Sequence, residues 1–303
     1  MWVSVLGCVR ILELEDTGAE VPESSACVPA EALGYRLPSA RWGLSALYAS
    51  RRLDDRPETA LHLSPSWFLA VGWQTSGFGC ADYGPPWAID PQHAGDPGCL
   101  GLSEGTTWNE LCRLYPATYR CDGYAGSFAG DAPEADALAL AWFALAAHGL
   151  LGRFELDPDD WYAASADPLA VERLTAAMHL WGPWTGEIGE VVQGCPDEVE
   201  ACLEGDLLRH AAGVADKLEL LGAAPCYDEP LAEADVRAFT RGLAAVHPEL
   251  AWDEGEQAAV DALTGRGFTT EAAAVVAALD AAVDLRLACP ERELYEWYRL
   301  PCP

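Results

Sequence analysis

Basic residues are scarce in this 303-residue chain, where 18 Lys and Arg stand against 48 Asp and Glu and give a formal net charge of −30 at pH 7. Such a field repels phosphate backbones and anionic lipid headgroups. We therefore expect no direct nucleic-acid binding and no membrane binding. Lys217 is the single Lys, beside 17 Arg, one Asn and three Ile, a bias typical of a high-GC bacterium.

Signals for export and membrane insertion are also missing. No Lys or Arg precedes Arg10, and the chain turns acidic at Glu13, which does not fit a secretory signal. The uncharged run from Ala137 to Leu151 has fifteen residues, whereas a transmembrane helix needs about 20. We expect a cytoplasmic protein, in which the eleven Cys remain reduced thiols.

Patterns that bind metals or cofactors do not occur. Zinc sites normally take two ligands about two to four residues apart, and the closest cysteines, Cys195 and Cys202, are seven apart. The six His form no His-Glu-x-x-His pattern, and neither a Gly-x-Gly-x-x-Gly nor a Walker loop is found. The sequence predicts no metal site and no cofactor.

The N-terminal part combines predicted strands with a long loop. Met1–Glu15 alternates in part, and Ser66–Gln74 is a compact apolar run; both favour strands. Ser39 is a candidate cap for a short helix through Tyr48. Between 77 and 105, eleven of 29 residues are Gly or Pro. That density predicts a loop, and loops this long are often functional.

From residue 131 onward the pattern is helical. Asp131-Ala-Pro-Glu134 is a cap signature before an apolar helix. A second helix follows Asp167-Pro168, and its apolar stripe is Val171, Leu174, Met178 and Trp181. Further helix starts are predicted at Cys195-Pro196, Pro230, Asp253 and Thr270, with stops at Gly222, Pro248 and Gly265.

These patterns predict an α+β fold. An N-terminal β-containing, loop-rich region, residues 1–130 and rich in Trp, would pack on a mostly α-helical C-terminal bundle, residues 131–303. The charge agrees with two regions, because residues 1–150 have a net charge of −10 and residues 151–303 one of −20. The predicted helical region is therefore the more acidic one.

The candidate binding site lies at a predicted helix end. Trp181-Gly-Pro-Trp184 holds two indoles near one corner, with Glu187 and Glu190 just beyond, and Trp is a frequent anchor in protein interfaces. Two alternatives remain for the same residues. Trp184 can fold back over the helix end, or the two rings can form a platform for a sugar.

The candidate catalytic site lies in the predicted loop. A glycine-rich segment leads to Cys80, with His93 as a possible base and Asp90 to orient it. Gln74, six residues before Cys80, resembles the arrangement in papain-like cysteine proteases. That family needs a helix starting at the Cys, which Pro85-Pro86 excludes. Two helix pairs, Asp206 with His210 and Glu172 with His179, are interpreted as surface pairs.

Two classes of function follow. The first is an acidic intracellular protein-binding module, such as an inhibitor, an immunity-type protein or an adaptor, that docks a basic partner surface through opposite charge and Trp anchors. The alternative is a hydrolase of unfamiliar family, with the Cys80 and His93 site in the 77–99 loop.

Overall fold

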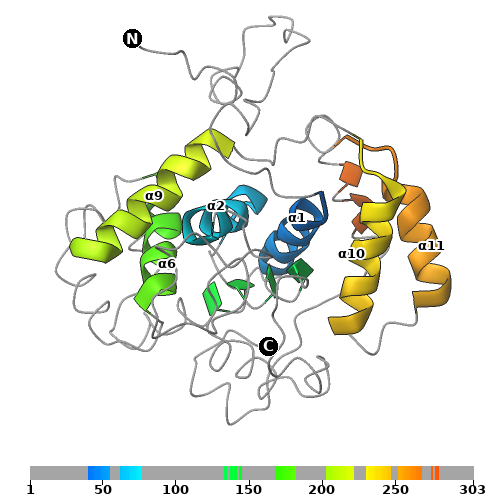
Figure 1. Cartoon of the computed structure of the whole chain (residues 1–303), viewed down its shortest axis with the longest axis horizontal. Helices are drawn as coiled ribbons and strands as arrows, with labels where there is room; N and C mark the ends of the chain where they lie inside the picture. The colour runs from blue at the N-terminus through cyan, green and yellow to red at the C-terminus, as the bar shows by residue number, and fades with distance from the viewer. Residues whose placement is uncertain are drawn as a thin grey trace, which may run out of the picture.

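The computed structural model describes residues 40–54, 62–76, 168–181, 203–221, 230–246 and 252–267, and parts of 133–144 and 274–279. Nearly all of these residues are helical (Figure 1). The six labelled helices are α1 (Ala40–Asp54), α2 (Pro65–Ser76), α6 (Ala170–Trp181), α9 (Gly205–Leu221), α10 (Glu233–Val246) and α11 (Trp252–Leu263).

The predicted α+β class is wrong for the part of the chain that the structure describes. Its only β feature is one isolated antiparallel bridge between Pro230 and Gly267. The run Ser66–Gln74, predicted as a strand, lies inside α2, and its residues from Trp67 to Trp73 are buried. A helix that is buried on all sides has no apolar stripe, so its sequence cannot be told from a buried strand by periodicity. The predicted strand Met1–Glu15 and the predicted loop 77–105 lie outside the described residues.

Most of the helix predictions in the described ranges are confirmed. The helix expected after Ser39 is α1, which continues to Asp54, and the helix expected after Asp167-Pro168 is α6. The predicted stops at Gly222, Pro248 and Gly265 follow the ends of α9, α10 and α11 by one or two residues. Gly265 has a φ of 82°, a conformation that ends helices and favours glycine.

Helix α1 occupies the centre of the packing (Figure 1). It contacts α2 on one side and α10 on the other, while α9 packs against both α2 and α6, and α10 packs against α11. Every residue from Trp42 to Ser50 is buried, so this part of α1 has no solvent-exposed face. The described helices therefore form two groups, α2, α6 and α9 in one and α10 and α11 in the other, with α1 between them.

Large aromatic side chains join these helices. The Tyr48 ring of α1 meets the Phe239 ring of α10 edge-on, with 6.3 Å between centroids, and both side chains are almost fully buried. In α2, the buried Trp67 donates its indole N–H to the backbone carbonyl of Glu172 in α6 at 3.1 Å. Burying each such ring contributes about 1.5–3 kcal/mol.

Two helical glycines allow close approach between segments. A Cβ at Gly213 of α9 would overlap the side-chain amide of Gln74 in α2, and a Cβ at Gly242 of α10 would overlap the carboxylate of Glu134. The absence of a side chain at these positions sets the distance between the helices and those polar groups.

The predicted boundary between residues 130 and 131 stays a prediction. In the described part, helices from both sides of it are in contact, α1 with α10 and α2 with α9. None of the described helices is both long enough and apolar enough to cross a membrane.

Candidate functional site

Of the residues predicted as sites, only Trp181 falls in the described part of the chain, as the last residue of α6. The other members of the candidate binding site, Trp184, Glu187 and Glu190, lie outside the described residues. So do the candidate catalytic residues, Cys80, Asp90 and His93. The structure therefore brings no predicted site together, and both sites remain predictions.

A different group of polar side chains meets where α6 and α9 pack. The imidazole rings of His179 in α6 and His210 in α9 are stacked, with 5.6 Å between centroids and 24° between planes. The Phe143 ring stands edge-on to His179, at 5.8 Å and 85°. His210 is 7% exposed, and its Nε2 has no hydrogen-bond partner in the described structure.

The interpretation of Asp206 with His210 as a surface pair is wrong. The carboxylate of Asp206 accepts a hydrogen bond from Arg209 on the exposed side of α9, whereas His210 points into the contact with α6. The position of His210 along α9 explains why its ring is buried while the Asp206 carboxylate is exposed. Leu207, His210 and Val214 follow at three- and four-residue steps, so His210 belongs to the apolar stripe of the helix.

Lys217 lies about two turns after His210 in α9 and is only partly exposed to solvent. Its Nζ donates to Gln74 Oε1 at 2.6 Å and to the Gly213 carbonyl at 3.3 Å. It also lies 5.9 Å from the centroid of the Trp73 ring, a cation–π distance. The contacts with Gln74 and Trp73 connect α9 to α2.

Burial controls the protonation of this cluster. It lowers the pKa of His210 from 6.5 to about 3, and the charges of His179 and Lys217 act in the same direction. Burial also lowers the pKa of Lys217, while the nearby Asp216 carboxylate opposes that change. His210 is therefore neutral at pH 7, and neutral imidazole rings can stack inside an apolar helix contact.

The described residues hold no group of three or more His, Cys, Asp or Glu side chains placed to bind a metal ion. Chemically, the stacked pair supplies a buried group that stays neutral near pH 7 and takes up a proton only at a cost. This is the property of a pH-sensitive contact.

A second buried polar contact joins residues 93 apart in sequence. Arg41 of α1 donates from Nε to Glu134 Oε1 at 2.7 Å and from Nη2 to Oε2 at 2.8 Å. The Glu134 side chain is fully buried, and that of Arg41 is 22% exposed. Burial raises the pKa of Glu134, and Arg41 acts against it. Both oxygens accept from the guanidinium, so protonating either one would lose a hydrogen bond.

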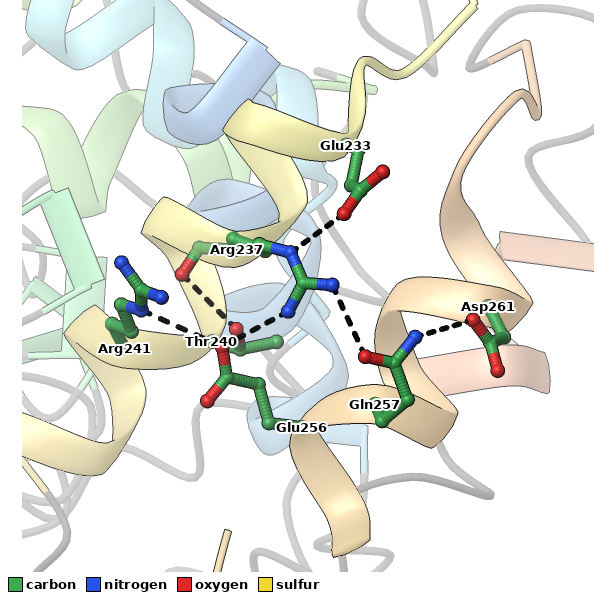
Figure 2. A network of polar contacts seen from close by, with 7 residues as sticks. All are labelled: Glu233, Arg237, Thr240, Arg241, Glu256, Gln257 and Asp261. Carbon is green, nitrogen blue, oxygen red and sulfur yellow. Dashed lines mark hydrogen bonds and ion pairs between the residues drawn. The ribbon is translucent and has the colours of Figure 1, made fainter. Parts of the chain in front are cut away.

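A third polar group lies on the surface of α10 and α11 (Figure 2). Arg237 donates to Glu233 at 2.7 Å and to Gln257 at 3.1 Å. Glu256 stands between Arg237 and Arg241, 3.5 Å from each. The network links the two helices, and it contributes little stability because these side chains are partly or largely exposed.

The histidine cluster could have been suspected only in part from the sequence. His210 lies on the apolar stripe of its helix, which signals burial, but nothing in the sequence indicates that His179, 31 residues earlier, is its partner.

Comparisons with family models, curated proteins and solved structures find no match for this chain.

Proposed function

We propose that this protein is an acidic, cytoplasmic protein-binding module, of the inhibitor, immunity or adaptor type, that docks the basic surface of a partner protein. The net charge of −30 supports this proposal. A charge of this size speeds association with a basic partner and repels nucleic acids and anionic membranes.

The exposed face of α9 is the observation that carries the proposal. Four acidic residues on α9 or directly before it are exposed, namely Glu204, Asp206, Asp216 and Glu219. Arg209 is the one exposed cation among residues 203–221, and it is paired with Asp206. Lys217, the other cation of α9, contacts Gln74. The solvent-facing side of α9 is therefore negative.

Other cations of the described helices are also paired with carboxylates of this protein. Arg41 binds the buried Glu134, and Arg237 and Arg241 bind carboxylates of α10 and α11. These carboxylates offset their positive charges. The acidic residues left over, in the described part and in the rest of the sequence, set the sign of the surface.

The described ranges hold 13 of the 48 acidic residues and 9 of the 18 basic ones. Most of the acidic excess therefore belongs to the rest of the sequence, which includes Glu187 and Glu190 of the predicted binding site. This distribution supports steering by the field of the whole chain, with α9 supplying one defined negative face.

The dependence of association on salt tests the proposal. The protein is immobilised and incubated with lysate of its source organism, and a stoichiometric partner is identified and purified. Its association rate constant is then measured from about 20 to about 150 mM salt. We expect this constant to fall about tenfold or more over that range, with a smaller change in the dissociation rate. An association rate indifferent to salt, or an acidic partner, would contradict the proposal.

A charge-matched comparison tests the role of α9. One triple variant neutralises exposed acids of the α9 face, and a control removes the same charge from α10 and α11. The α9 variant is Glu204→Gln, Asp216→Asn and Glu219→Gln, and the control is Glu233→Gln, Glu256→Gln and Asp261→Asn. Slower association of the α9 variant alone supports docking at α9. Equal slowing would leave the steering intact but exclude α9 as the docking face.

A further inference from the structure

The contact between α6 and α9 contains two titratable rings where an apolar contact would be expected. His179 and His210 stack face to face, and only 7% of His210 is exposed to solvent. Its Nε2 finds no hydrogen-bond partner among the residues that the structure describes. A neutral ring tolerates this environment, but a charged ring needs a partner or water.

We propose that the stacked histidines form an acid-sensitive latch, which holds α6 against α9 at neutral pH and releases this contact under mild acid. The device is independent of any partner and goes beyond the proposed function.

Among the residues that the structure describes, the groups around His210 do not offer a proton a counter-charge. In α6, the facing titratable group is His179, and Glu172 and Arg173 lie about two turns earlier in the helix. Helix α2, which also packs on α9, contains no titratable residue. It contributes the neutral Gln74, which already binds Lys217.

On α9 itself, Lys217 is the cation whose charge acts on His210, Arg209 directly precedes His210 and pairs with Asp206, and Asp206 lies one turn before His210. Asp206 is 79% exposed and accepts from Arg209, so its carboxylate lies on the solvent side of the helix. A proton on His210 would therefore meet a second ring and a lysine. Separation of the helices is the simplest way for the charged ring to reach water.

The direction of the pH effect follows from the pKa of His210. Its ring takes up a proton near pH 6.5 when exposed but only near pH 3 in the closed contact. Acidification therefore favours the open state, and the closed contact loses stability as the pH falls from 6.5 toward 3. Between pH 7 and pH 5 this shift increases the opening equilibrium constant about 25-fold.

Hydrogen exchange measured by mass spectrometry tests the latch. The full-length protein is compared at about pH 7 and about pH 5, with exchange times corrected for the chemical rate. We expect peptides from 170–181 and 205–221 to lose protection about 25-fold at the lower pH, while peptides from α10 and α11 keep theirs. Equal protection at both pH values, or an equal loss in all helices, would overturn the proposal.

Two variants identify the residue responsible. His210→Phe keeps a stacked ring without a titratable group, and we expect it to remove the pH-dependent loss of protection. His62→Phe makes the same change at an exposed position and should leave the loss intact. If His210→Phe does not fold, the wild-type experiment still tests the latch. It compares the loss of protection in α6 and α9 with that in α10 and α11. A pH-dependent loss of protection in His210→Phe as large as that in the wild type would also overturn the proposal.

Discussion

Replacing Arg41 with Met is expected to leave the Glu134 carboxylate buried without its counter-charge. In the native pair both carboxylate oxygens accept from the guanidinium, at 2.7 and 2.8 Å. The Glu134 side chain is fully buried, and Arg41 keeps 22% of its side-chain surface in contact with solvent. The two partners of this ion pair therefore differ in burial. Removing Arg41 and removing Glu134 should lower the stability by different amounts.

The expected loss of stability follows from the geometry of the ion pair. Two unit charges about 4 Å apart attract by about 4 kcal/mol at an effective dielectric constant near 20, and removing one partner of a buried pair costs about 3–5 kcal/mol. We expect Arg41→Met to lower the free energy of unfolding by that amount near pH 8. Glu134→Gln should cost less, about 1–3 kcal/mol, because the partly exposed Arg41 can be hydrated.

The loss should also depend on pH. Burial raises the pKa of Glu134, and Arg41 opposes this change, so Arg41→Met raises that pKa further. A carboxyl whose folded pKa exceeds its unfolded value gains stability when it takes up a proton. Arg41→Met should therefore recover part of its lost stability as the pH falls from 8 toward 5.5, whereas Glu134→Gln should not show this recovery.

Urea unfolding followed by far-ultraviolet circular dichroism measures these effects at both pH values. Arg209→Met is the control, because it breaks an ion pair with Asp206 in which both side chains are more than 70% exposed, and exposed pairs contribute little. The reasoning is refuted if Arg41→Met loses less than about 1 kcal/mol at pH 8. It is also refuted if Glu134→Gln proves the more damaging change.

Three further outcomes can be checked by the same unfolding assay. Gly242→Ala should destabilise by about 1–3 kcal/mol in spite of the better helix propensity of Ala, because its Cβ overlaps the Glu134 carboxylate; an unchanged midpoint would contradict the close approach. Phe239→Ala should cost about 3–5 kcal/mol, because it empties the contact with Tyr48 between α10 and α1. Arg237→Gln should leave the unfolding midpoint almost unchanged in high salt, because its carboxylate partners lie on the surface.

Sequence patterns predicted helices from one apolar face, or from a cap residue as for α1 after Ser39, whose residues from Trp42 to Ser50 are buried. The helix α6 follows its expected stripe and keeps Leu174 and Met178 buried. The pattern failed at α2, where residues from Trp67 to Trp73 are buried on every side. A helix in the middle of a packed protein needs no polar face, so the signal that would identify it is missing.

The polar contacts were harder to predict, because their partners come from distant parts of the chain. Glu134 was expected to cap its own helix, but its carboxylate binds Arg41, 93 residues earlier. His210 was expected at the surface, and only the packing of α9 on α6 explains its contact with His179. Local spacing describes which residues share a helix face, and tertiary packing decides which side chains meet.

The central position of α1 has a consequence for synthesis on the ribosome. Its residues from Trp42 to Ser50 are buried, and one side of the helix is covered by α10, which ends at Val246. At about 5–20 residues per second, roughly 10–40 s pass between the synthesis of the end of α1 and that of the end of α10. During this interval Tyr48 lacks Phe239, so that side of the nascent helix stays open to chaperones.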